Sequence, residues 1–144
     1  SDPGERRRVR FVAFSPDGRN ASSSSKDEDL TYVWDISERK LHRKLQHTAK
    51  LSRFAFSPDG ARLVTFEANS VLRHWSFPEC EPLESVQIPE ARRSSRFSTD
   101  ARYLLGSVWA TGEVEVWDCQ TGAAVQTFQL PHHANPDGKS RSID

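Results

Sequence analysis

The sequence contains no methionine, only two cysteines and no long apolar run. A membrane-spanning helix needs about 18 or more apolar residues in succession, so we expect no membrane partner. Cys80 and Cys119 occur at different points of the sequence pattern, which favours free thiols over a disulfide framework and predicts a reducing, cytoplasmic environment. The 20 basic and 20 acidic residues cancel, so no global field favours nucleic acid.

Sequence patterns for catalysis and for cofactor or metal binding are also missing. There is no glycine-rich phosphate loop and no zinc-site spacing of cysteines and histidines. His132 and His133 are neighbours and point to opposite sides of an extended chain, which does not suit a shared metal. Cys80 lies among glutamates without an adjacent histidine to activate it. We therefore expect no enzyme activity, no cofactor and no metal.

The sequence does contain one segment three times. The segment begins with a phenylalanine and a Ser-x-Asp turn, and a tryptophan follows about 20 residues later. The phenylalanines are Phe14, Phe56 and Phe97, and the tryptophans are Trp34, Trp75 and Trp117. Successive phenylalanines are 42 and 41 residues apart, and successive tryptophans are 41 and 42 residues apart. Two independent landmarks therefore give the same period.

Each repeat is predicted to form four β-strands separated by turns. In the Ser-Pro-Asp-Gly turns, proline fixes φ at the first corner and glycine accepts the positive φ that the turn requires. The strands expected are 9–14, 20–25, 30–36 and 40–46, then 51–56, 62–66, 71–77 and 83–88, then a weak strand ending at 97 followed by 102–108, 114–118 and 123–130. The serine run 22–25 predicts poor packing. In the third repeat Arg92 and Ser95 stand where the other repeats have apolar residues, with Arg93 and Arg96 beside them.

A period of about 40–45 residues, with a Phe-Ser-Pro-Asp-Gly turn and a strand ending in Val-Trp-Asp, resembles the WD-repeat (WD40) β-propeller family. The resemblance extends roughly from residue 9 to residue 130. It implies an all-β fold, a partial β-propeller of three four-stranded antiparallel blades. On this interpretation residues 1–8 are a basic lead-in, 9–50, 51–91 and 92–130 are the blades, and 131–144 are a polar tail or the entry to a further blade.

Three blades are fewer than the four to eight of a closed propeller. Together with the absence of methionine, including at position 1, this predicts a piece of a longer protein, although several chains could also complete a ring. The implied structural partners are further blades, from the parent chain or from a second copy.

In the WD-repeat family a structural network joins a loop histidine, a strand hydroxyl, an acid and the strand tryptophan. The resemblance assigns these roles in the second repeat to His47, Thr65, Asn69 and Trp75, with asparagine in place of the acid. In the other repeats, which lack the loop histidine, it pairs Ser24 with Trp34 and Ser107 with Trp117. Because a buried indole N–H requires an acceptor, we expect these residues to be structural.

Basic residues recur where each repeat begins, and repeats superpose by rotation, so an arc of positive charge is expected on one face of the ring. The residues predicted to bind a partner are Arg8, Arg10, Arg53, Arg92, Arg93 and Arg96, with Trp109 in a turn of the third repeat. Guanidinium groups bind carboxylates and phosphates, which favours an acidic or phosphorylated protein segment. Otherwise these arginines simply solvate the ends of loops.

The function expected is a non-catalytic scaffold that mediates protein–protein interaction. Two alternatives stay open. One is a nucleic-acid-binding module that uses the same basic arc and binds less tightly as salt increases. The other is a sensor or regulatory repeat region of a larger multidomain enzyme, whose catalytic domain lies outside these residues.

Overall fold

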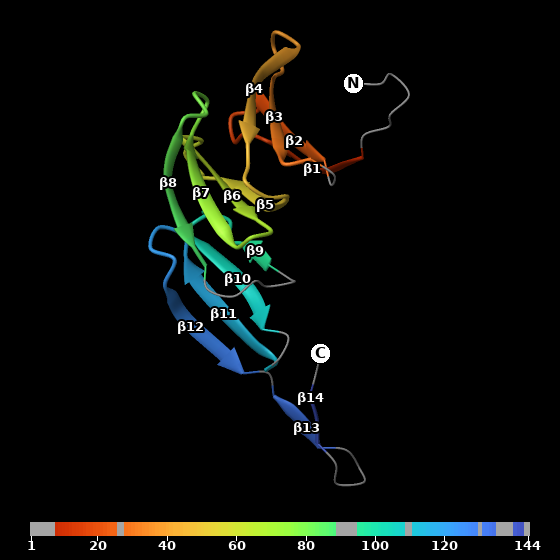
Figure 1. The fold of residues 1–144 in the computed structure, drawn as a ribbon, viewed down its shortest axis with the longest axis vertical. Helices are drawn as coiled ribbons and strands as arrows, with labels where there is room; N and C mark the ends of the chain where they lie inside the picture. Colours follow the sequence, from red (N-terminus) through yellow and green to blue (C-terminus); the bar gives the residue numbers. More distant parts are fainter. Residues whose placement is uncertain are drawn as a thin grey trace.

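The computed structural model describes residues 8–25, 28–88, 95–108, 111–129, 131–134 and 140–142. These residues form strands and turns (Figure 1), and none of them is helical. Within this described part there is accordingly no helix that could cross a membrane. Twelve of the strands make three antiparallel four-stranded sheets that follow one another along the chain. The expected partial propeller of three four-stranded blades is confirmed.

The strands lie close to where the repeats predict them. Blade 1 contains β1 (Val9–Phe14), β2 (Asn20–Ser25), β3 (Leu30–Asp35) and β4 (Lys40–Gln46). Blade 2 contains β5 (Leu51–Phe56), β6 (Arg62–Glu67), β7 (Val71–Ser76) and β8 (Pro82–Gln87). Blade 3 contains β9 (Ser95–Phe97), β10 (Tyr103–Val108), β11 (Glu113–Asp118) and β12 (Ala124–Gln129). Two short strands, β13 (His132–Ala134) and β14 (Ser140–Ser142), pair with each other after the last blade.

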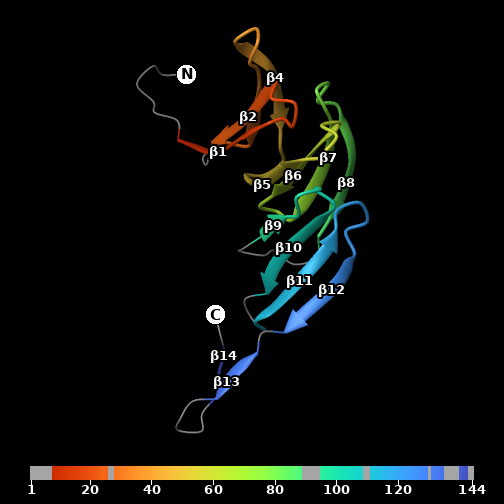
Figure 2. The same cartoon turned by 180° about the vertical axis from the view of Figure 1, so that it is seen from behind.

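The three blades are arranged in an arc, which is visible from both sides (Figures 1 and 2). Strands β1, β5 and β9 lie along its inner side, and β4, β8 and β12 lie along its outer side. Consecutive strands are neighbours within each sheet, so every blade runs from the inner to the outer side before the chain returns inward. Equivalent residues of the repeats therefore occupy equivalent places around the arc.

The turn between the first two strands of a blade is built in the same way three times. In blade 1, Ser15 Oγ donates to Asp17 Oδ1 at 2.6 Å and accepts the backbone N–H of Asn20 at 3.1 Å. The bond from Ser15 and a backbone N–H bond lower the pKa of Asp17. The same pattern recurs at Ser57 with Asp59 and at Ser98 with Asp100. The residue after each aspartate has positive φ, at Gly18, Gly60 and Ala101, so only the third turn places a side chain in the left-handed region.

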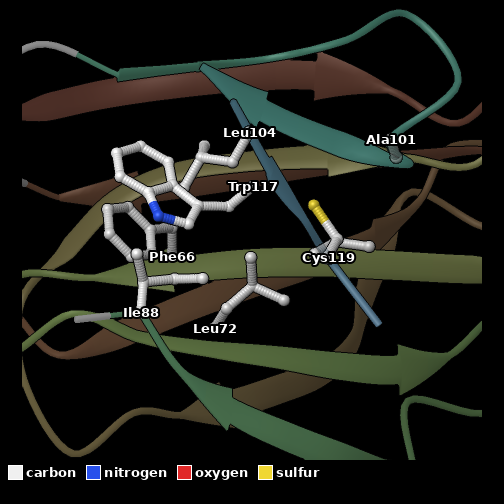
Figure 3. Packing of buried hydrophobic residues seen from close by; sticks show 8 residues of the cluster. Phe66, Leu72, Ile88, Ala101, Leu104, Trp117 and Cys119 are labelled. Atoms are coloured by element: carbon white, nitrogen blue, oxygen red, sulfur yellow. The ribbon is translucent and has the colours of Figure 1, made fainter. Parts of the chain in front are cut away.

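Apolar side chains fill the two spaces between blades. Between blades 1 and 2 the buried cluster consists of Val33, Leu45, Leu63, Trp75, Phe77 and Cys80. Between blades 2 and 3 it consists of Val64, Phe66, Leu72, Ile88, Ala101, Leu104, Trp117 and Cys119 (Figure 3). In both clusters the tryptophan belongs to the later blade and lies against the earlier one. We call this side of a blade its tryptophan face and the other side its opposite face.

The serine run of β2 does not disrupt the strand. β2 pairs with β1 and with β3 along its length. Ser22 and Ser24 are buried, and their hydroxyls have no hydrogen-bond partner among the described residues. The expected poor packing therefore takes the form of two unsatisfied hydroxyls, while the strand itself is complete. In blade 3, β9 has three residues, and residues 89–94 of the arginine-rich approach to it lie outside the described ranges.

Candidate protein-interaction surface

Arginine side chains from three blades lie near one another on the inner side of the arc. Arg10 lies in β1, Arg53 in β5 and Arg96 in β9. The Nε of Arg53 donates to the carbonyl oxygen of Ser95 at 2.9 Å, and this bond links blade 2 to blade 3. The guanidinium groups of Arg10 and Arg53 lie 5.0 and 5.5 Å from the centre of the Phe11 ring. We call Arg10, Phe11, Arg53 and Arg96 the inner-strand cluster.

The inner-strand cluster carries positive charge that the described residues do not neutralise. The pKa of Arg53 is lowered first by burial and then by repulsion from Arg96 and Arg10. No ion pair joins any of the three guanidinium groups to a carboxylate within the described ranges. Contact with an aromatic face stabilises such cations by about 0.5–1 kcal/mol at exposed sites. An anionic group placed here would relieve the mutual repulsion of the arginines.

Phe11 contacts guanidinium groups of two blades, and its own ring packs against the neighbouring blade. It makes an edge-on contact with Phe54, with the two ring centres 6.2 Å apart. Phe54 is partly buried against the cluster between blades 1 and 2. The geometry of the inner-strand cluster therefore depends on the packing of these two blades.

The other residues predicted to bind a partner are less informative. Arg8 is exposed at the start of the described chain, just before β1. Arg92, Arg93 and Trp109 lie outside the described residues. Of the predicted basic arc, the structure thus brings together Arg10, Arg53 and Arg96. Sequence inspection missed Phe11, whose signal was an aromatic residue directly after an arginine in an inner strand.

The network expected around Trp75 is present with different members. The Nε1–H of Trp75 donates to Thr65 Oγ1 at 3.0 Å, as the resemblance implies. His47 lies edge-on to Trp75, with ring centres 5.9 Å apart, but its Nε2 forms a 2.8 Å hydrogen bond with Thr31 Oγ1 of blade 1. His47 therefore links two blades, since it bonds to Thr31 of blade 1 and packs against Trp75 of blade 2. The resemblance had implied a bond to Thr65 instead.

The acid of this network is Glu67, and Asn69 does not fill that role. The Oε1 of Glu67 accepts the Thr48 N–H at 2.9 Å and Arg73 Nε at 3.2 Å, and its Oε2 accepts Thr48 Oγ1 at 2.9 Å. His47 Nδ1 lies 3.4 Å from Glu67 Oε1. Burial lowers the pKa of His47, and the attraction of the Glu67 carboxylate partly opposes this shift. Asn69 instead donates to Thr48 Oγ1 at 3.1 Å.

A signal for Glu67 was present in the sequence. It ends β6, a strand that contains Leu63, Val64 and Phe66 and whose last five residues are all buried. Charged residues are almost never fully buried without a partner, so an acid in such a strand predicts a buried ion pair. The partner Arg73 lies in the adjacent strand β7, opposite Thr65.

The assignments for the other two tryptophans are each wrong by one residue: Ser23 takes the place of Ser24 in blade 1, and the equivalent position in blade 3 is a glycine. The Nε1–H of Trp34 donates to Ser23 Oγ at 2.9 Å, whereas Ser24 is buried without a hydrogen-bond partner in the described chain. In blade 3, the pairing of Leu104 with Trp117 places Gly106 at the position equivalent to Thr65. Ser107 therefore lies on the opposite face. A strand alternates its side chains, so an error of one residue changes the face.

The comparisons with known proteins agree with this architecture. The family model described as WD domain, G-beta repeat matches residues 3–35, which include the first three strands of blade 1. This match supports the resemblance of the chain to the WD-repeat family. Members of this family are generally non-enzymatic scaffolds.

The regions similar to this chain lie within longer proteins. The 66 kDa stress protein of Physarum polycephalum is 29% identical over 92 residues, which are 62% of this chain and 15% of that protein. The U3 small nucleolar RNA-associated protein 21 homolog of Schizosaccharomyces pombe is 32% identical over 73 residues, 50% of this chain and 8% of that protein. The solved structure of U3-55K matches 88% of this chain and 40% of its own with a TM-score of 0.67 and 18% identity, which shows the fold alone. This WD-repeat chain thus spans less than a sixth of these two curated relatives.

The two thiols of the WD repeats are packing groups. Cys80 lies in the cluster between blades 1 and 2, and Cys119 in the cluster between blades 2 and 3. Burial raises the pKa of Cys80 to about 11 and that of Cys119 to about 12. Because the thiolate is the nucleophile, both groups are unreactive near neutral pH.

Proposed function

We propose that this WD-repeat chain is a non-catalytic scaffold that binds an acidic or phosphorylated segment of another protein at the inner-strand cluster. The observation that supports this proposal is the convergence of Arg10, Arg53 and Arg96 without a carboxylate partner among the described residues. A planar guanidinium forms paired hydrogen bonds with carboxylate and phosphate oxygens. The phenyl ring of Phe11 limits the motion of two of these groups, which reduces the entropy lost when an anion binds.

The two buried thiols, with their raised pKa, support two further proposals, one on location and one on catalysis. A buried thiol that is not ionised is compatible with a reducing compartment, so a cytoplasmic location is proposed, to be checked by imaging the tagged protein. The absence of catalytic activity is proposed on the same chemistry, since the thiols are the strongest nucleophiles that the sequence offers.

A second candidate is RNA binding through the same cluster. One relative is named for its association with the U3 small nucleolar RNA. The zero net charge of this chain argues for the protein ligand, because nucleic-acid binding usually relies on an extended basic surface. The two candidates differ in how strongly their affinities depend on salt.

Fluorescence anisotropy with three labelled probes tests the proposal. The probes are a glutamate-rich decapeptide, the same peptide with two phosphoserines, and a single-stranded RNA of ten nucleotides. We expect the phosphopeptide to bind most tightly, and the double variant Arg10→Ala with Arg96→Ala to weaken it at least tenfold. Arg102→Ala is the matched control, because Arg102 is exposed and lies over Tyr103 in blade 3.

Three outcomes separate the candidates. Equal weakening by the double variant and by the control would overturn the assignment of the inner-strand cluster. Tighter binding of RNA, with affinity that falls steeply between 50 and 200 mM salt, would favour the second candidate. Far-UV circular dichroism melts of each variant show whether the fold is retained, which is expected because Arg10 and Arg96 are exposed.

A further inference from the structure

A hollow of about 300 Å³ lies at the internal contact between blades 2 and 3. Its lining comes from both blades. The lining includes the buried Val64, His74, Ala101 and Cys119 and the more exposed Ser57 and Gln120. We call the space that these six residues border the inter-blade hollow. Described strands and turns border it on both sides, so two neighbouring blades set its shape.

The inter-blade hollow is found where a cysteine takes the place of a phenylalanine in the repeat. Cys119 and Phe77 both follow the strand tryptophan by two residues. Each donates its backbone N–H to the residue just before the second strand of its own blade, at 2.9 Å in blade 3 and 3.0 Å in blade 2. Phe77 is 6% exposed, and its ring centre lies 4.8 Å from that of Phe56. Cys119 has no ring, so the contact between blades 2 and 3 has room for one.

A buried polar group in the lining, His74, also departs from the repeat. The residue directly before the tryptophan is Val33 in blade 1 and Val116 in blade 3. His74 is 3% exposed, and its Nε2 lies 2.7 Å from the backbone carbonyl oxygen of Cys119. A carbonyl oxygen only accepts, so Nε2 carries the proton and Nδ1 of the neutral ring is an acceptor. No described residue donates to Nδ1. A buried acceptor without a donor costs free energy, which a ligand that supplies a donor recovers.

We propose that the inter-blade hollow binds the side chain of a tyrosine from a partner protein. The ring takes the place that Phe77 fills between blades 1 and 2, beside Val64 and Ala101. The space is sufficient, because an apolar cavity of about 150 Å³ already accepts benzene. The hydroxyl donates to His74 Nδ1, which is shielded from solvent and is reached only as the ring enters between the blades. This tyrosine site uses no residue of the inner-strand cluster, so it does not depend on the anionic ligand proposed there.

Two soluble probes that differ by one hydroxyl test the tyrosine site. They are N-acetyltyrosinamide and N-acetylphenylalaninamide. Titrations followed by amide proton–nitrogen NMR measure both dissociation constants, and shifts of the Val64 and Ala101 amide signals locate the site. The tyrosine probe should bind about tenfold more tightly than the phenylalanine probe, which is the effect of one net hydrogen bond.

Three variants assign the roles of the lining residues. His74→Val introduces the residue that the other repeats have before the tryptophan, and it should make the two probes bind equally. Cys119→Phe introduces the ring that Phe77 provides in blade 2, and by filling the hollow it should weaken both probes at least tenfold. Cys80→Ala is the matched control, because Cys80 is the buried cysteine of the other internal contact. It should bind both probes like the unmodified chain.

The outcomes that would overturn the proposal are distinct. If neither probe binds the unmodified chain, the hollow is not a tyrosine site. Equal binding of the two probes to the unmodified chain would show that the hydroxyl gains nothing from His74. Binding that survives Cys119→Phe, or shifts confined to residues outside the hollow, would place the probes elsewhere. Circular dichroism melts show whether each variant is folded, and the comparison of the two probes on the unmodified chain requires no variant.

Discussion

Replacing Trp75 and Trp34 by alanine measures how much the contact between blades stabilises this chain. Both tryptophans occupy the same repeat position, and both donate Nε1–H to a hydroxyl of the neighbouring strand. Trp34 is 39% exposed at the end of the arc, whereas Trp75 is 6% exposed against blade 1. For a tryptophan surface of up to ~250 Å², this difference in exposed fraction means that Trp75 buries about 80 Å² more than Trp34. At about 25 cal/mol/Å² this area is worth about 2 kcal/mol.

We expect Trp75→Ala to lower the free energy of unfolding by about 3–5 kcal/mol, and Trp34→Ala to lower it by about 1–3 kcal/mol. Urea denaturation followed by far-UV circular dichroism measures both values, provided that the denaturant slopes agree. Equal losses in the two variants would refute the reasoning, since they would show that burial between blades does not set the contribution of this tryptophan.

Four further substitutions and one labelling experiment test polar and thiol side chains of the blades. Glu67→Ala should destabilise the fold by about 1–3 kcal/mol, because it leaves the part-buried hydrogen bonds from the Thr48 N–H and the Arg73 guanidinium without their acceptor, whereas Glu84→Ala should cost at most about 1 kcal/mol because its ion pair is exposed. Ser24→Ala should be neutral or stabilise by about 1 kcal/mol in thermal melts, because it removes an unsatisfied hydroxyl, and Ser15→Ala should destabilise by a similar amount because it breaks the turn. Cys119, with its pKa raised to about 12, should resist a thiol reagent at pH 8 in the folded chain and react once urea unfolds it, and rapid labelling without urea would contradict its burial.

The contrast between Glu67 and Asn69 shows where reasoning from a repeat pattern stops. The pattern places the acid in the turn between the second and third strands, and it finds asparagine there. The structure uses a carboxylate two residues earlier, at the end of β6, where the Thr48 N–H and Arg73 converge. Thr48 and Glu67 are 19 residues apart, so only the return of the chain from β4 to β5 brings them together. A buried ion pair has thereby taken over the role that the pattern assigns to a turn residue.

The sequence by itself determined the period, the strands and the fold class of this protein. These features depend on local chemistry, namely the Ser-x-Asp turn, the left-handed residue after it and the alternation of side chains along a strand. The tertiary structure alone decided which tryptophan is covered, which hydroxyl each indole reaches and which arginines converge on Phe11. Which tryptophan is covered and how Arg53 reaches Phe11 depend on contacts between blades, which residues about 40 positions apart acquire only when the blades stack. The hydroxyl that each indole reaches depends on the register of adjacent strands within a blade.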